Sequence, residues 1–271
     1  MKYFLSIIAI FKNESMILEE WIKHHIDEGV EHFYLINHNS DDDFLKIIKK
    51  YQSYITLTSD TYTQEEHVLN YLINKHYLNL IKKESEWVIL CDIDEYFYNK
   101  HNYKNIAHFL KNTGEISNNI GTIWTPWKLF YAAKTDKIES SIIKELLYRR
   151  PVVKINDYGC GKSIYRTRDL NQLSIHHGSN PYNYVLNREI LNKRKDQNNN
   201  DTLILNENSN ICCNHYRFIS KDYYNKVKCI RKGQKSKQNH IYTMEYFNTI
   251  NSEKQKLKDI VLYNKKYKIT N

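Results

Sequence analysis

Hydrophobic and polar positions along the first hundred residues form a repeating series of short and long segments. Four short runs are rich in apolar residues, which is typical of strands in the interior of a sheet. The longer segments between them carry apolar residues at helical spacing, such as Leu18, Trp21 and Ile22. The pattern predicts strands at residues 3–11, 32–36, 54–58 and 88–93, and helices at residues 16–28, 44–51 and 64–83.

Strand and helix alternate in this order, which predicts an α/β fold with a mainly parallel sheet covered by helices on both sides. After Asn99 the pattern changes to a β-rich middle that begins with an aromatic strand at residues 122–130. Amphipathic helical sequence runs from Lys221 to the end. We expect one domain at residues 1–220 and a C-terminal helical extension at residues 221–271 that packs on the same domain.

The fourth predicted strand leads into two carboxylates, Asp92 and Asp94, with Glu95 beside them. In an extended chain Asp92 and Asp94 point to the same side, because side chains alternate. A buried strand seldom ends in carboxylates that lack a cation or a hydrogen-bonding partner. Mg²⁺ and Mn²⁺ prefer oxygen ligands, and Mg²⁺ sites commonly combine one or two carboxylates with substrate phosphates. The acidic pair therefore predicts a metal–diphosphate site, although the same pattern also occurs in solvated turns.

Polar residues follow each of the four predicted strands. They are Asn13, residues 37–43, Asp60, and Asp92 with Asp94. Ligands of open parallel sheets bind outside the carboxyl ends of the strands, so these residues predict one shared site. The sequence has no Gly-x-Gly-x-x-Gly and no Gly-x-x-x-x-Gly-Lys-Ser/Thr, which argues against a Rossmann dehydrogenase and a P-loop NTPase. If the site binds a nucleotide diphosphate, a metal and side chains must replace a glycine-rich phosphate cradle.

The chain has 271 residues and a formal net charge of +9, with basic residues concentrated in residues 221–237 and 254–268. No Arg-rich, Gly-rich or RNP-like motif accompanies them, which favours a solvated helical face over a nucleic-acid site. Five cysteines, an odd number without a C-x-x-C spacing, argue against a disulfide framework and favour buried thiols. Residues 1–11 lack a signal-peptide cleavage site and fit a first strand better, and no apolar stretch reaches transmembrane length. We expect a soluble protein in a reducing compartment.

Several blocks of the sequence occur in a characteristic order. They are Phe11-Lys12-Asn13-Glu14 with residues 18–25, then residues 29–34, 37–42, 87–96 and 162–166, His176-His177, and Asn214-His215-Tyr216 with Lys226. Together they resemble glycosyltransferase family 92 and related family 2-like proteins of the GT-A fold. The resemblance extends from about residue 3 to residue 232, and the ordered set is more specific than any single block.

The resemblance implies transfer of a sugar from a nucleotide-diphosphate sugar, a UDP-sugar, to a glycan or glycosylated acceptor, with Mn²⁺ or Mg²⁺ as cofactor. Asp92 and Asp94 engage the metal that bridges the diphosphate, and Asp94 is the acid assigned to catalysis. The resemblance further assigns Asn13, Glu14, Asn39, Asp41, Asp42 and Asp60 to nucleotide binding, Lys162 and Arg166 to the phosphates, and His177 and His215 to the metal shell.

An inverting displacement also needs a base that takes the proton of the acceptor hydroxyl. Asp157 and Asp169 are the candidates in the middle region. The sequence lacks the membrane anchor of many eukaryotic relatives, which predicts cytoplasmic action in a bacterium or a virus-infected cell. We expect neither a transmembrane segment nor a nucleic-acid partner. The oligomeric state stays open, and a homo-oligomer is possible.

Two other functions fit part of the pattern. A metal-dependent nucleotidyl or phosphoryl transferase would share the acidic strand end, but it would prefer nucleoside triphosphates to nucleotide sugars. A non-catalytic binding module would use the basic C-terminal region to hold nucleic acid or another partner, with strongly salt-sensitive binding. The acids at the sheet edge argue against this module, because they repel phosphate unless a metal is present.

Overall fold

The computed structural model describes most of the chain. The described residues are 1–63, 68–100, 103–112, 121–151, 161–168, 170–173, 194–195, 201–204, 210–230, 242–254 and 256–268.

The N-terminal part contains the predicted alternation of strands and helices. Its elements are β1 (Tyr3–Phe11), α1 (Ser15–Asp27), β2 (His32–Asn37), α2 (Phe44–Lys50), the 3₁₀ turn η1 (Gln52–Tyr54), β3 (Ile55–Ser59), α3 (Val68–Glu84) and β4 (Ser85–Leu90). The four strands lie in the order β3-β2-β1-β4, and each neighbouring pair is parallel. Parallel pairing places the carboxyl ends of all four strands at one edge, as the sequence predicted.

The second half extends this sheet and adds elements on top of it. They are β5 (Glu95–Asn99), α4 (Ile106–Asn112), β6 (Thr122–Leu129), α5 (Ile142–Glu145), β7 (Tyr148–Arg149), β8 (Gly161–Arg166), β9 (Arg194–Lys195), β10 (Asp201–Ile204), β11 (Ile211–His215), α6 (Lys221–Tyr223), the π-helical turn η2 (Tyr224–Lys228), α7 (Met244–Asn251), β12 (Leu257–Lys258) and α8 (Val261–Tyr267).

β8 joins the two halves of the sheet, because it pairs antiparallel with both β4 and β6. β11 pairs with β6 in parallel and with β5 antiparallel. Within the described ranges the sheet has ten strands and is mixed, with its parallel part at the N-terminal side. The predicted α/β fold class, a mainly parallel sheet flanked by helices, is confirmed.

Helices cover both faces of the parallel part of the sheet. α1, α2 and α4 pack on the face that carries Leu5, Ile7 and Ala9 of β1. α3 packs on the opposite face, which carries Ile8 of β1 and Val88 of β4. Successive side chains of a strand point to opposite faces of the sheet. Because helices cover both faces, each of these strands needs a continuous run of apolar residues.

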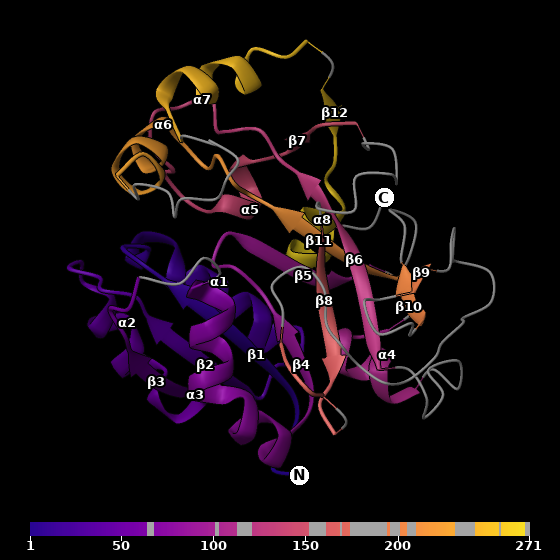
Figure 1. Ribbon diagram of the computed structural model, residues 1–271. Helices are drawn as coiled ribbons and strands as arrows, with labels where there is room; N and C mark the ends of the chain where they lie inside the picture. Colours follow the sequence, from indigo (N-terminus) through magenta and orange to yellow (C-terminus); the bar gives the residue numbers. More distant parts are fainter. Residues whose placement is uncertain are drawn as a thin grey trace.

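The C-terminal elements pack on the same body. Figure 1 shows α6 and α7 at the upper side of the molecule, away from the N-terminus. α8 contacts the end of α1 through the ion pairs of Lys266 with Asp27 and of Lys265 with Glu28, and β12 pairs with β7. The domain division at residue 220 stays a prediction. No helix among the residues given above is long and apolar enough to cross a membrane.

Two adjacent histidines connect α1 to β5. His24 and His25 are both buried, His24 donates from Nε2 to the carbonyl of Phe97 over 2.7 Å, and His25 accepts from the Phe97 N–H over 3.3 Å. His25 also donates from Nδ1 to the carbonyl of Trp21 over 2.9 Å. Burial lowers the pKa of His24 well below its ordinary value and lowers the pKa of His25 to about 3. Both rings are therefore neutral at neutral pH and serve as packing groups.

We expect the free energy of unfolding to decrease as the pH falls from 7.5 to 5.5. Below about pH 6.5 the unfolded chain protonates histidines that the folded protein keeps neutral, so this stabilisation is complete above that pH and is lost toward the folded-state pKa. Each such histidine contributes up to about 1.4 kcal/mol per pH unit. Denaturant titrations at three pH values measure the slope. His25→Gln should flatten it, whereas His108→Gln, at an exposed position, should not; an equally steep slope in both variants contradicts the assignment.

Candidate active site

The acidic turn (residues 91–94) connects β4 to β5 at the carboxyl end of β4. β4 ends at Leu90, so the predicted continuation of the strand to residue 93 is wrong. The Glu95 N–H donates to the carbonyl of Asp92 over 3.1 Å, and Glu95 Oε2 accepts from the Asp92 N–H over 2.9 Å. These bonds close a turn, and the turn, rather than strand alternation, sets the directions of Asp92 and Asp94.

Lys162, near the start of β8, neutralises the first half of the acidic turn. Its Nζ donates to Asp92 Oδ2 over 2.8 Å and lies 3.7 Å from Glu95 Oε2. The Lys162 side chain is fully buried, whereas that of Asp92 is 47% exposed. Burial acts to lower the pKa of Lys162, but Asp92 and Glu95 outweigh it and raise that pKa above its ordinary value. Lys162 is therefore charged and pairs with the acidic turn.

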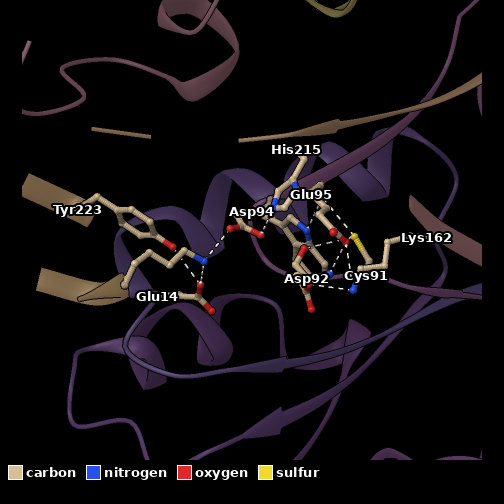
Figure 2. A network of polar contacts seen from close by, with 10 residues as sticks. Glu14, Cys91, Asp92, Asp94, Glu95, Lys162, His215 and Tyr223 are labelled. Carbon is tan, nitrogen blue, oxygen red and sulfur yellow. Dashed lines mark hydrogen bonds and ion pairs between the residues drawn. The ribbon is translucent and has the colours of Figure 1, made fainter. Parts of the chain in front are cut away.

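Lys228, at the end of η2, neutralises the second half. Its Nζ donates to Asp94 Oδ2 over 2.6 Å and lies 3.6 Å from Oε1 of Glu14, which follows β1. The hydroxyl of Tyr223 donates to the same oxygen of Glu14 over 3.0 Å. In Figure 2, Asp94 lies between Glu14 with Tyr223 on one side and Asp92 with Lys162 on the other. One polar network therefore crosses the carboxyl ends of β1 and β4 and the start of β8.

His215 approaches Asp94 from β11, where it lies opposite Glu95. Its Nε2 is 3.5 Å from Asp94 Oδ1, and the Tyr216 N–H donates to the Asp94 carbonyl over 2.8 Å. Burial lowers the pKa of His215 although Asp94 acts to raise it, so the imidazole is neutral at neutral pH. Its Nδ1 is buried and has no hydrogen-bond partner within the described part of the chain. The neutral ring is the form that binds metals.

More carboxyl groups than lysines meet at the acidic turn within the described residues. Burial acts to raise the pKa values of Asp92 and Asp94, but the nearby lysines outweigh it and hold both pKa values below the ordinary range. Burial raises the pKa of Glu95 well above its ordinary value, which favours the neutral acid. Four carboxyl groups, those of Glu14, Asp92, Asp94 and Glu95, face the two ammonium groups of Lys162 and Lys228. The surplus of carboxyl oxygens can accept a further cation.

The residues fit a divalent cation that is shared with substrate oxygens. Asp92 has an exposed carboxylate, and Asp94 lies beside a neutral imidazole. In the described ranges no three histidine, cysteine or acidic residues are grouped closely enough to hold a metal by themselves. Mg²⁺ sites commonly use one or two carboxylates together with substrate phosphates, and Asp92 and Asp94 are the two carboxylates available here.

The predicted nucleotide-binding residues after β1 and β2 form one connected pair of loops. Asn13 and Asn39 have positive φ angles of 54° and 59°, a conformation that asparagine tolerates better than most residues. Asn13 Oδ1 accepts from the Asp41 N–H over 2.9 Å, and Asp42 Oδ2 accepts from the Ser15 N–H over 2.7 Å. These bonds fix the two loops against each other. Asp42 also accepts from the backbone N–H of Ser15, the first residue of α1, which has no acceptor within the helix.

The structure keeps two other predicted residues apart from the acidic turn. Asp60, after β3, accepts from Lys75 over 2.9 Å and from His76 over 2.7 Å. Arg166 lies opposite Trp87 at the far end of β4, with its guanidinium carbon 4.4 Å from the centre of the Trp87 ring. Arg166 therefore belongs to the amino-terminal side of that strand pair and not to the acidic turn.

Three predicted residues, the base candidates Asp157 and Asp169 and the metal ligand His177, lie outside the described residues. Their roles stay predictions. The sequence patterns missed Lys228 and Tyr223, because the basic residues after position 221 were interpreted as a solvated face. Both residues are buried, and the adjacent aromatic pair Tyr223–Tyr224 was the available signal for an inward-facing segment.

Replacing Lys162 with methionine should destabilise the fold by about 3 kcal/mol, because it leaves Asp92 and Glu95 without their cation. The value is at the low end of the range for broken buried pairs, since Asp92 is partly solvated and Glu95 can hold a proton. Lys46→Met is the control: its side chain is 75% exposed and pairs with Asp43 at the surface, so we expect less than about 1 kcal/mol. Denaturant unfolding compares the two. Equal stabilities would show that Lys162 does not compensate the acidic turn.

Comparisons with known proteins identify the family of the chain. The model of glycosyltransferase family 92 matches residues 3–268. A family 92 protein of Arabidopsis thaliana is 29% identical over 102 residues, which cover 36% of this chain and 17% of that protein. A family 92 protein of Ricinus communis is 24% identical over 124 residues, which cover 44% of this chain and 21% of that protein. The chain thus spans about a fifth of the length of these relatives.

Two solved structures align with the chain at low sequence identity. S. aureus TarS residues 1–349 aligns with a TM-score of 0.44 at 15% identity, over 100% of this chain and 73% of that chain. Glucosyl-3-phosphoglycerate synthase from Mycobacterium tuberculosis, in complex with Mn²⁺, UDP and glucosyl-3-phosphoglycerate, aligns with a TM-score of 0.34 at 13% identity, over 62% and 58% of the two chains. Because the family model covers nearly the entire sequence, this protein belongs to glycosyltransferase family 92.

Proposed function

We propose that the protein is a metal-dependent glycosyltransferase that moves a sugar from a nucleotide-diphosphate sugar, a UDP-sugar, to a glycan or glycosylated acceptor. Membership of family 92 supports the reaction class. The observation that carries the donor assignment is the acidic turn, where a partly exposed Asp92 and a buried Asp94 meet at the carboxyl edge of the parallel strands. This edge is where open α/β sheets bind their ligands.

The charge of the acidic turn supports a divalent cation rather than direct contact with phosphate. Carboxylates repel a diphosphate, so a cation is needed between them, and the four carboxyl groups at and beside the turn outnumber the two lysines that face them. Asp92 and Asp94 would hold Mn²⁺ or Mg²⁺, with His215 beside them. The cation would neutralise the charge that develops on the departing diphosphate.

The loops after β1, β2 and β3 supply the nucleoside end of the proposed donor site. The ends of β3 and β4 are three strands apart, about 14 Å at ordinary strand spacing, so Asp60 and the acidic turn can contact opposite ends of one nucleotide. Asn13 and Asp41 lie between these two ends, joined by their hydrogen bond. We further propose an inverting displacement, with its base among the acids of the middle region such as Asp157 or Asp169.

UDP should stabilise the protein only when Mn²⁺ or Mg²⁺ is present. A ligand at one hundred times its dissociation constant adds about 2.7 kcal/mol, which is several degrees in the melting midpoint at this chain length. Asp94→Asn should remove the stabilisation by UDP and metal and abolish sugar transfer while the protein remains folded. Asp27→Asn, whose side chain is 61% exposed at the end of α1, is the control and should respond like the wild type.

The competing functions give different results in the same assay. Nucleoside triphosphates that stabilise the protein better than any nucleotide sugar would favour a nucleotidyl or phosphoryl transferase. No response to nucleotides, together with strong salt-sensitive binding of RNA or DNA, would favour the binding module. An undiminished response to UDP in Asp94→Asn would contradict the metal assignment.

A further inference from the structure

The ammonium group of Lys228 lies between carboxylates from two neighbouring strand ends. Asp94 follows β4 and Glu14 follows β1, and these strands pair directly. The Lys228 Nζ is 2.6 Å from Asp94 Oδ2 and 3.6 Å from Glu14 Oε1. A cation held by two carboxylates at this edge lies in the region where a divalent cation and a diphosphate are proposed to bind.

The segment Ser220–Lys228 carries this ammonium to the acidic turn and is firmly held. Ser220 Oγ accepts from the Tyr223 N–H over 3.2 Å, and the Tyr223 hydroxyl bonds to Glu14. Ile219, just before the segment, has a φ of 41°, which is unfavourable for a β-branched residue. Its carbonyl accepts from the Ala133 N–H over 2.7 Å. Strained backbone and π-helical turns such as η2 both occur frequently at functional sites.

Lys228 and Lys162 differ in what they can reach. The Lys162 side chain is fully buried and contacts Asp92 and Glu95. It extends from β8, which lies between β4 and β6 in the interior of the sheet. The Lys228 side chain is 10% exposed and extends from the end of a short turn. A lysine side chain has a flexible stem and a compact charge, which suits it to contact phosphate oxygens. Of the two side chains, that of Lys228 is the one partly exposed to a ligand.

We propose that Lys228 binds the diphosphate of the donor and competes with the divalent cation for Asp94. The proposal rests on the function proposed above. The ammonium of Lys228 and the metal are both positive, and both are attracted to the carboxylate of Asp94. When no phosphate is present, the ammonium therefore weakens binding of the metal, and a bound metal weakens the ion pair of Lys228 with Asp94. A diphosphate provides new oxygens for the ammonium, which allows lysine and metal to remain together. Metal and nucleotide therefore bind cooperatively. Because Lys228 belongs to the segment Ser220–Lys228, this segment contacts the diphosphate when both are bound.

The test is calorimetric titration of two probes, Mn²⁺ alone and UDP at saturating Mn²⁺, into wild type, Lys228→Met and Lys228→Gln. Removing the ammonium should tighten binding of Mn²⁺ alone about fivefold or more, because a competitor is lost. The same change should weaken binding of UDP about tenfold, because a charge-assisted contact is lost. Lys228→Gln keeps a hydrogen-bond donor near Asp94, so it carries the test if Lys228→Met does not fold. Lys221→Met, at an exposed position in the same segment, should match the wild type.

The opposite signs of the two effects identify the mechanism. If Mn²⁺ binding in the folded Lys228 variants is unchanged or weaker, Lys228 does not compete with the metal and the proposal is overturned. If UDP binding is unchanged, Lys228 does not contact the diphosphate, which also overturns it. A wild type that binds Mn²⁺ but no uridine or other nucleotide refutes the proposed function itself, and that result is distinct from either failure in the variants.

Discussion

The structure depends on neutralising carboxylates that are buried at the carboxyl edge of the sheet. Asp94 and Glu95 are almost completely inaccessible, and Asp92 is only partly solvated. Unpaired charges at such positions would cost several kcal/mol each. The compensating ammonium groups come from residues 70 and 134 positions further along the chain. The carboxylates of the acidic turn are therefore compensated only when the C-terminal half packs onto the N-terminal half.

The mixed topology of the sheet makes this possible. β8 runs antiparallel to β4, so its first residues, including Lys162, meet the last residues of β4. β11 runs antiparallel to β5, which places His215 opposite Glu95. Lys228 follows β11 by only thirteen positions, through a segment that Tyr223 attaches to Glu14. The parallel strands supply the carboxylates, and the later strands and turns supply the cations and the imidazole.

Local patterns in the sequence predicted the features that depend on local physics. The apolar run of β1 and the helical spacing of α1 gave element bounds within one residue, and the acid pair marked the site. The end of β4 was misplaced because it depends on hydrogen bonds between Asp92 and Glu95, which no periodicity contains. Lys228 was missed for a related reason. A lysine is buried only when a carboxylate compensates it, and Asp94 is too distant in sequence for a local pattern to reveal the pair.

The central claim is that the acidic turn and a divalent cation together hold the donor diphosphate. The most direct measurement is a crystal structure with UDP and Mn²⁺, in which anomalous scattering locates the manganese. The account predicts a manganese peak at Asp92 and Asp94, beside the diphosphate, with the Lys228 ammonium within hydrogen-bonding distance of a phosphate oxygen. A diphosphate bound away from the acidic turn, or manganese that does not contact Asp92 or Asp94, would contradict it.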